Sequence, residues 1–173
     1  MFTLITGGSK CGRSALGERL LDGFPGEKYY IAAMQPYGEE AQAAIVRHRE
    51  MRAGKGFVTI EQYTDLGTLT LPEGCAVLLE CTGNLTANEM FTAGESDPTE
   101  KILAGIDRLS RTAAELVVIH SEVGADGIVY APETEAYIRV MGRLGQALAA
   151  RADAVAECVY GIPILQKGVL PCC

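Results

Sequence analysis

The residues with the clearest chemical meaning form a glycine-rich stretch close to the start of the chain. The stretch consists of Gly7, Gly8, Ser9, Lys10, Cys11, Gly12, Arg13 and Ser14. It follows the G-x-x-x-x-G-K-[S/T] spacing of a phosphate-binding loop (P-loop), except that Arg13 replaces the lysine. Backbone amides of such a loop, and the start of the helix that follows, attract anions. We therefore expect the stretch to bind the phosphates of a nucleotide, with the Ser14 hydroxyl on Mg²⁺ and the Arg13 cation near the β- and γ-phosphates. The alternative is a glycine-rich turn without a ligand.

Two carboxylates follow apolar runs further along the chain. Glu80 ends the run 76–79, where P-loop enzymes place an acidic residue near Mg²⁺. We interpret Glu80 as a catalytic and metal-binding residue; the alternative is a carboxylate that caps the next helix. Glu122 comes shortly after the run 116–120 and could hold a water on Mg²⁺, bind a ribose or solvate a loop. We assign Glu122 to the nucleotide site.

His48 lies in a segment rich in cations, between Arg47 and Arg49 and four residues before Arg52. A neutral imidazole is a nucleophile that attacks phosphorus readily. Arginines beside it would lower its proton affinity and would also bind incoming phosphates. This pattern predicts a nucleophile at His48, with Arg49 and Arg52 in the nucleotide site. The alternative is a half-buried histidine that only packs.

Composition narrows the class of protein. The chain has 173 residues, a net charge of −7, 48% hydrophobic residues and 21% charged residues, which fits one soluble domain over residues 1–173. The negative charge argues against non-specific binding to nucleic acid or to an anionic membrane. Six cysteines without a C-x-x-C pair, and only two histidines, argue against a zinc site. We expect Cys75, Cys81 and Cys158 in the core. A cleavable signal peptide would remove the P-loop, so we predict a cytoplasmic protein.

Short β-branched runs alternate with amphipathic segments, and these elements must position the candidate residues. The predicted strands are 2–6, 29–33, 57–60, 76–80, 116–120, 154–160 and 162–166. The predicted helices are one after the P-loop and those over 38–52, 84–91, 99–112 and 133–151. This order favours an α/β, P-loop NTPase-like three-layer sandwich with a mainly parallel sheet. Right-handed crossovers would then bring the loops 7–14, 80–83 and 121–124 together at one edge of the sheet.

Several stretches also follow the motifs of one family in the same order. Residues 4–14 are similar to L-V-T-G-G-x-R-S-G-K-S, and residues 45–52 to I-x-x-H-[RK]-x-x-R. Residues 78–81 followed by Asn84 resemble L-L-[DE]-C with N-L, and residues 122–129 resemble E-V-G-x-G-I-V. Together they resemble the bifunctional adenosylcobinamide kinase/adenosylcobinamide-phosphate guanylyltransferase family of cobalamin assembly.

The resemblance implies two reactions at one nucleotide site. A nucleoside triphosphate, ATP or GTP, would phosphorylate adenosylcobinamide, and GMP from GTP would then pass to the product through a guanylyl group on His48. Mg²⁺ would assist both transfers. The partners would be a corrinoid and a nucleotide, with no nucleic acid or membrane, and the family association implies a homotrimer.

The chain also departs from the family motifs. Arg13 stands at the lysine position, and a planar guanidinium does not occupy the place of a compact ammonium. The other departures are an apparent insertion of Asp126, a proline delayed by Tyr130 and Ala131, and Val140 and Gly145 in place of Asp and Asn. Two alternatives therefore stay open: a P-loop kinase or nucleotidyltransferase for another small molecule, and a nucleotide-binding homologue without catalysis.

Overall fold

The computed structural model describes residues 1–171, and within one helix it leaves the side chains of Glu40, Ala44, His48, Met51 and Arg52 undescribed. The strands are β1 (Phe2–Thr6), β2 (Lys28–Ala32), β3 (Phe57–Glu61), β4 (Ala76–Glu80), β5 (Glu115–Ile119), β6 (Ala154–Val159) and β7 (Ile162–Lys167). The helices are α1 (Arg13–Leu20), α2 (Gly38–Arg52), α3 (Thr82–Phe91), α4 (Thr99–Thr112) and α5 (Pro132–Arg151), with a short 3₁₀ turn η1 (Leu66–Thr68).

The seven strands form one sheet in the order β3-β2-β4-β5-β1-β6-β7. Every neighbouring pair is parallel except β6 and β7, which form an antiparallel hairpin at one edge. The predicted α/β class with a mainly parallel sheet is confirmed. The predicted elements are all present; most ends agree and the others differ by one or two residues, as with α3, which begins at Thr82 rather than at residue 84.

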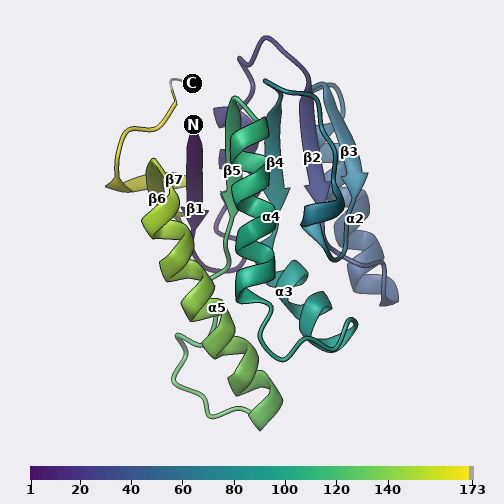
Figure 1. Cartoon of the computed structure of the whole chain (residues 1–173), viewed down its shortest axis with the longest axis vertical. Helices are drawn as coiled ribbons and strands as arrows, with labels where there is room; N and C mark the ends of the chain where they lie inside the picture. The colour runs from purple at the N-terminus through teal and green to yellow at the C-terminus, as the bar shows by residue number, and fades with distance from the viewer. Residues whose placement is uncertain (172–173) are drawn as a thin grey trace.

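Helices cover both faces of the sheet, because the central strands are apolar on both sides. On one face, Leu16 of α1 packs with Ile5, Leu78 and Val117. The helices α3, α4 and α5 cover the other face, where a larger core includes Leu85, Ile106 and Leu144. Figure 1 shows α4 and α5 lying across the sheet on this side. The layers therefore hold the carboxyl ends of β1, β4 and β5 at a common edge.

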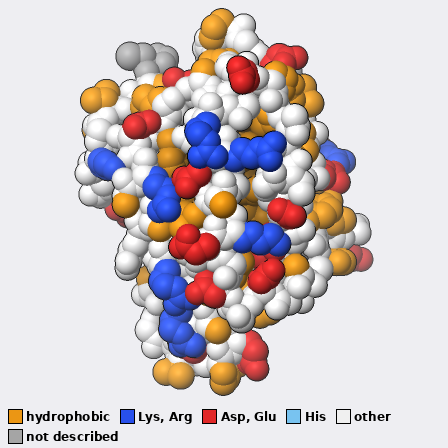
Figure 2. Space-filling model, viewed as in Figure 1, with side chains coloured by type: hydrophobic (Ala, Val, Ile, Leu, Met, Phe, Trp, Pro, Cys, Tyr) orange, Lys and Arg blue, Asp and Glu red, His pale blue; other side chains and the backbone are white. Residues whose placement is uncertain are grey.

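The surface carries charges of both signs. On the face drawn in Figure 2, Lys and Arg side chains lie among Asp and Glu side chains and form no continuous basic surface. A phosphate on this face would have to be held by a few local groups. Among the described residues, no helix combines the length and the apolar character that crossing a membrane requires.

Candidate nucleotide site

The P-loop connects β1 to α1 at the carboxyl edge of the sheet. Gly7 and Gly12 have φ values of 137° and 98°, a region that residues with a side chain rarely adopt. The loop is also tightly seated: a Cβ on Gly7 would lie 2.7 Å from the carbonyl oxygen of Cys158, and one on Gly12 would lie 3.0 Å from Cα of Gly161. Both glycines are therefore required for this conformation. Lys10 occupies the exposed part of the loop with a φ of 58°.

Ser14 and Glu80 meet at the mouth of the P-loop. The Ser14 hydroxyl donates to Oε1 of Glu80 at 2.6 Å, and the Tyr30 hydroxyl donates to Oε2 at 3.0 Å. Ser14 and Glu80 line a cleft of about 370 Å³ together with Lys10 and Arg13. The cleft is thus lined by the P-loop on one side and by the end of β4 on the other.

The Ser14–Glu80 pair fits Mg²⁺ by its donor chemistry. Hydroxyl and carboxylate oxygens are hard ligands, and Mg²⁺ in nucleotide sites takes one or two protein ligands beside phosphate and water oxygens. No group of three or more His, Cys, Asp and Glu side chains that could enclose a metal occurs in the described part of the chain. A metal here would accordingly depend on the phosphates of a nucleotide for its remaining ligands.

Arg13 is directed at the end of β5. Its Nη1 donates to the carbonyl oxygen of His120 at 2.6 Å. The imidazole of His120 is buried and hydrogen-bonded through Nδ1 to the Thr82 hydroxyl at 2.8 Å. Burial, and secondly the charge of Arg13, lower the pKa of His120 to about 4, so this histidine is neutral at pH 7. The cation at the lysine position of the motif therefore braces the P-loop against β5.

Glu122 lies beside the first residues of the P-loop. Its amide donates to the carbonyl oxygen of Gly7 at 3.2 Å, and its Oε1 accepts a hydrogen bond from the Thr6 hydroxyl at 3.0 Å. Together with the Ser14–Glu80 contact, this brings the three predicted loops together at one edge. That part of the prediction is confirmed.

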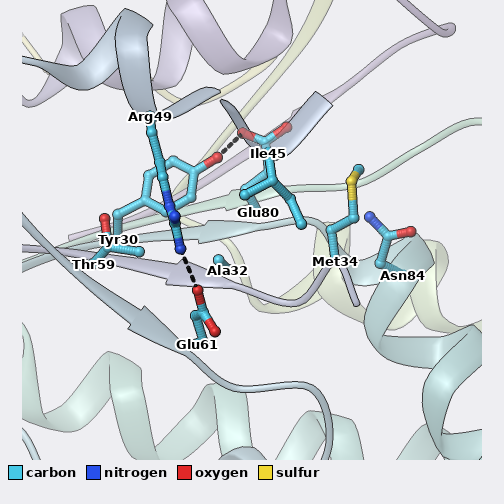
Figure 3. A pocket seen from close by; sticks show the side chains of 9 residues that line it. All are labelled: Tyr30, Ala32, Met34, Ile45, Arg49, Thr59, Glu61, Glu80 and Asn84. Carbon is cyan, nitrogen blue, oxygen red and sulfur yellow. Dashed lines mark hydrogen bonds and ion pairs between the residues drawn. The ribbon is translucent and has the colours of Figure 1, made fainter. Parts of the chain in front are cut away.

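A narrower pocket of about 30 Å³ adjoins the cleft between α2, β2 and β3. Figure 3 shows that Nη2 of Arg49 reaches Oε1 of Glu61, at 2.6 Å, across this pocket. Met34, Glu80 and Asn84 line both the pocket and the cleft, so the pocket that Ile45 and Arg49 of α2 line adjoins the P-loop cleft. The predicted nucleophile His48 and the predicted ligand Arg52 belong to α2, and their side chains lie outside the described residues.

Sequence reasoning missed the roles of Tyr30 and Cys81. Tyr30 was expected only as part of a buried strand, yet it lines the pocket beside the cleft and its hydroxyl donates to Glu80. Cys81 was expected in the core, but its half-buried side chain lines the cleft, with a pKa raised by burial and then by the charge of Glu80. The expectation for Cys75 and Cys158 is confirmed, since both are buried. Cys81 differs because it follows the last residue of β4, where the sheet opens to the cleft.

Known proteins match this chain over nearly its whole length. The sequence model of the CobU family, described as cobinamide kinase / cobinamide phosphate guanyltransferase, matches residues 3–165. The bifunctional adenosylcobalamin biosynthesis protein CobU of Salmonella typhimurium is 33% identical over 184 residues, covering 96% of this chain and 100% of that protein. CobU of Escherichia coli is 32% identical with the same coverage. The bifunctional adenosylcobalamin biosynthesis protein CobP of Pseudomonas aeruginosa is 26% identical over 97% of this chain and 98% of that protein.

Among solved structures, a DnaB-like replicative helicase described with its primase gives a TM-score of 0.47 at 8% identity. The alignment covers 95% of this chain and 54% of that one. The sequence matches are the informative ones, because the family match and two relatives above 30% identity extend over nearly the full length. This chain belongs to the cobinamide kinase / cobinamide phosphate guanyltransferase family.

Proposed function

We propose that this protein phosphorylates adenosylcobinamide and then transfers GMP from GTP to the resulting phosphate. Family membership supports the pair of reactions. The observation that carries the proposal for this chain is the 2.6 Å contact between Ser14 and Glu80 at the mouth of the P-loop cleft. A hydroxyl and a carboxylate side by side next to the glycine-rich loop support a metal site that would face the phosphates of a nucleotide.

In the first reaction, the hydroxyl oxygen of the acceptor forms a bond to the γ-phosphorus. The bond between that phosphorus and the β,γ-bridging oxygen breaks, the nucleoside diphosphate leaves with the electron pair, and the hydroxyl proton is lost to a base. The P-loop amides and Lys10 bind the phosphates, while Ser14 and Glu80 would hold Mg²⁺. The metal, when bound, would neutralise charge on the β- and γ-phosphates.

In the second reaction, an imidazole nitrogen of His48 forms a bond to the α-phosphorus of GTP, and pyrophosphate leaves. A phosphate oxygen of the phosphorylated acceptor then displaces the imidazole from the GMP group, which restores His48. The covalent step divides one difficult transfer into two easier ones. Arg49, Arg52 and Glu122 complete the proposed nucleotide site. The pocket that α2 lines supports this assignment, since it shares three residues with the P-loop cleft.

The setting of the reaction is part of the same proposal. The protein acts in the cytoplasm as a homotrimer on a corrinoid and on GTP or ATP, without nucleic acid or membrane partners. Family membership supports the small-molecule partners. The net charge of −7 supports the exclusion of polyanionic partners.

Labelling with α-³²P-GTP tests the proposed function. The wild-type protein with Mg²⁺ should acquire one acid-labile, base-stable GMP group per chain, as a phosphoramidate does, and release it when cobinamide phosphate is added. His48→Asn should abolish labelling. The matched control is His120→Asn, which removes the other histidine, a buried one that is neutral at pH 7. Labelling that persists in His48→Asn would overturn the proposal.

A further inference from the structure

Two free thiols meet beneath the P-loop. Cys11 belongs to the loop, and Cys158 belongs to β6, the strand that pairs with β1. The Cys158 thiol donates to the carbonyl oxygen of Cys11 at 3.3 Å, and the two thiol groups are also within hydrogen-bonding reach of each other. Cys11 packs against the same apolar core to which Cys158 belongs. Residues 147 positions apart in the chain therefore lie side by side.

The backbone around the pair leaves little room between the loop and the strand. A Cβ on Gly7 would lie 2.7 Å from the carbonyl oxygen of Cys158 and 3.1 Å from Sγ of Cys11. One on Gly12 would lie 3.8 Å from Sγ of Cys158. The amide of Gly161 also donates to the carbonyl oxygen of Cys11 at 2.7 Å. These contacts hold Cys11 against β6.

The two thiols differ in their access to small molecules. The side chain of Cys11 is half-buried and lines the P-loop cleft, whereas that of Cys158 is buried. Burial, and secondly the neighbouring Cys11, raise the pKa of the Cys158 thiol, so it is protonated at pH 7. A small oxidant that enters the cleft therefore meets Cys11 first. An accessible thiol with a second thiol beside it is the usual arrangement of a redox-sensing cysteine and its resolving cysteine.

Cys11 is also a departure from the motif that residues 4–14 resemble, because it stands where L-V-T-G-G-x-R-S-G-K-S has a serine. A serine hydroxyl cannot form a disulfide. The other cysteine that lines the cleft, Cys81, has different neighbours: its Sγ accepts from Asn84 at 3.6 Å and from the Ser121 hydroxyl at 3.8 Å. We therefore assign Cys158, rather than Cys81, as the partner of Cys11.

We propose that Cys11 and Cys158 form a modification site for hydroperoxides, at which a reversible disulfide switches off nucleotide binding. The Cys11 thiolate attacks an oxygen of the hydroperoxide and the O–O bond breaks. The alkoxide leaves with the electron pair and takes up the proton that Cys11 lost, so the products are an alcohol and a sulfenic acid on Cys11. The sulfur of Cys158 then displaces the hydroxyl group from Cys11, and the hydroxide leaves as water with the proton of the Cys158 thiol. Two thiols are oxidised, the peroxide bond is reduced, and a dithiol reverses the reaction by exchange.

The disulfide would alter the P-loop itself. It brings the two sulfur atoms to about 2.05 Å, and it removes the proton through which Cys158 binds the carbonyl oxygen of Cys11. The side chain of Cys11 must then turn toward β6, and the peptide groups beside it, which belong to the phosphate-binding loop, must turn with it. Mg·ATP should therefore bind more weakly to the oxidised protein. This consequence rests on the proposed nucleotide site, whereas the linkage does not.

Peptide mapping tests the linkage. The parent protein carries Cys172→Ser and Cys173→Ser, because thiols at these two positions, which lie outside the described residues, would also consume oxidant. After reduction, it is treated with one equivalent of hydrogen peroxide, blocked with N-ethylmaleimide, digested and analysed by mass spectrometry. We expect a pair of peptides joined through Cys11 and Cys158, which dithiothreitol separates. The absence of a linked pair, or a pair joined through Cys75 or Cys81, would overturn the proposal.

Calorimetric titration of Mg·ATP tests the consequence. The oxidised parent should bind about tenfold more weakly than the reduced parent, and dithiothreitol should restore the affinity. In Cys158→Ser, whose hydroxyl can still donate to Cys11, peroxide should leave a sulfenic acid that dimedone traps and should not change the affinity. The matched control is Cys75→Ser, the same substitution at another buried cysteine, which should respond to peroxide as the parent does.

Equal affinities of the oxidised and reduced parent would overturn the proposal, as would an equal loss of affinity in Cys158→Ser. The comparison within the parent needs no substitution at the pair, so it remains decisive even where Cys158→Ser folds poorly. Failure of the proposed function has a different signature. The reduced parent would then not bind Mg·ATP, and the peptide map would still decide whether Cys11 and Cys158 are linked.

Discussion

Lys10 and Arg13 carry the two positive charges of the P-loop, and their surroundings differ. Arg13 is half-buried and donates to the carbonyl oxygen of His120 at 2.6 Å. A hydrogen bond from a charged donor contributes about 1.5–3 kcal/mol, so moving the guanidinium away from β5 would cost stability. Lys10 is exposed, lines the cleft and can rotate toward a ligand. We therefore expect Lys10 to bind phosphates and Arg13 to hold the loop in place.

Substitution of each cation by methionine should separate these roles. Lys10→Met should weaken Mg·GTP binding about tenfold, which corresponds to about 1.4 kcal/mol, and leave the melting temperature unchanged. Arg13→Met should lower the melting temperature by about 4–8 °C, because about 2 kcal/mol of stabilisation is lost in a domain of this size. Calorimetric titration and thermal unfolding measure the two effects. A large loss of stability in Lys10→Met, or none in Arg13→Met, would reverse the assignment.

His120 makes the stability of the fold sensitive to acid. Its pKa is about 4 in the folded protein against an ordinary value of 6.5, so the unfolded chain binds the proton first as the pH falls. The free energy of unfolding should therefore decrease between about pH 6.5 and pH 4, by up to about 3 kcal/mol from this residue. Urea unfolding of wild type and His120→Asn across this range isolates the contribution. Equal pH slopes in the two proteins would show that the imidazole is not the cause.

At the scale of elements, α2 is attached to the rest of the fold by its C-terminal end. Lys55, in the turn after α2, pairs with Glu18 of α1 at 2.6 Å. The Glu18 side chain is fully buried; Lys55 binds its Oε2, and among the described residues its Oε1 has no hydrogen-bond partner. A buried carboxylate that loses its cation is strongly destabilising. The pair thus links the helix that bears His48 to the helix that follows the P-loop.

Lys55→Met should lower the free energy of unfolding by about 3 kcal/mol, because it leaves the charge of Glu18 buried and unpaired. The double variant Glu18→Leu/Lys55→Met should recover most of that loss, since both charges are then absent. If the pair also positions α2, guanylylation of His48 should remain slow in the restored double variant. Chemical unfolding and the rate of α-³²P-GTP labelling distinguish the two effects. A single variant as stable as wild type would exclude the coupling.

The helices and strands could be predicted from the sequence. Strands of a parallel sheet are buried on both faces and are therefore short apolar runs, and the P-loop has a recognisable glycine pattern. Parallel connections also bring the ends of β1, β4 and β5 together. The contact between Tyr30 and Glu80 could not be predicted in this way. It depends on β2 lying next to β4 in a register that pairs Ala32 with Glu80, so that Tyr30, two residues earlier, faces the carboxylate. The direction of Arg13 likewise depends on tertiary contacts with β5.

At the scale of the whole molecule, the last strands support the first loop. The β6–β7 hairpin turns through Tyr160 and Gly161, which have φ values of 51° and 81° as a two-residue hairpin turn requires. The amide of Gly161 donates to the carbonyl oxygen of Cys11 at 2.7 Å, and its carbonyl oxygen accepts from Arg19 of α1 at 3.2 Å. Segments some 150 residues apart therefore fix the P-loop.

Gly161→Ala should weaken nucleotide binding although residue 161 lies outside the cleft. A Cβ there meets no neighbouring atom, so the cost is the left-handed backbone, about 1–2 kcal/mol, and the turn should relax away from Cys11. Gly74→Ala is the matched control. Gly74 has a φ of 75° and equally open space for a Cβ, and it precedes β4, so it lies at the amino ends of the strands, away from the P-loop. Both variants should lose similar stability in urea, whereas Gly161→Ala alone should weaken Mg·ATP binding, by about threefold to tenfold for 0.6–1.4 kcal/mol of lost support. Calorimetric titration decides the matter. Equal affinities in the two variants would mean that the hairpin stabilises the fold without shaping the P-loop.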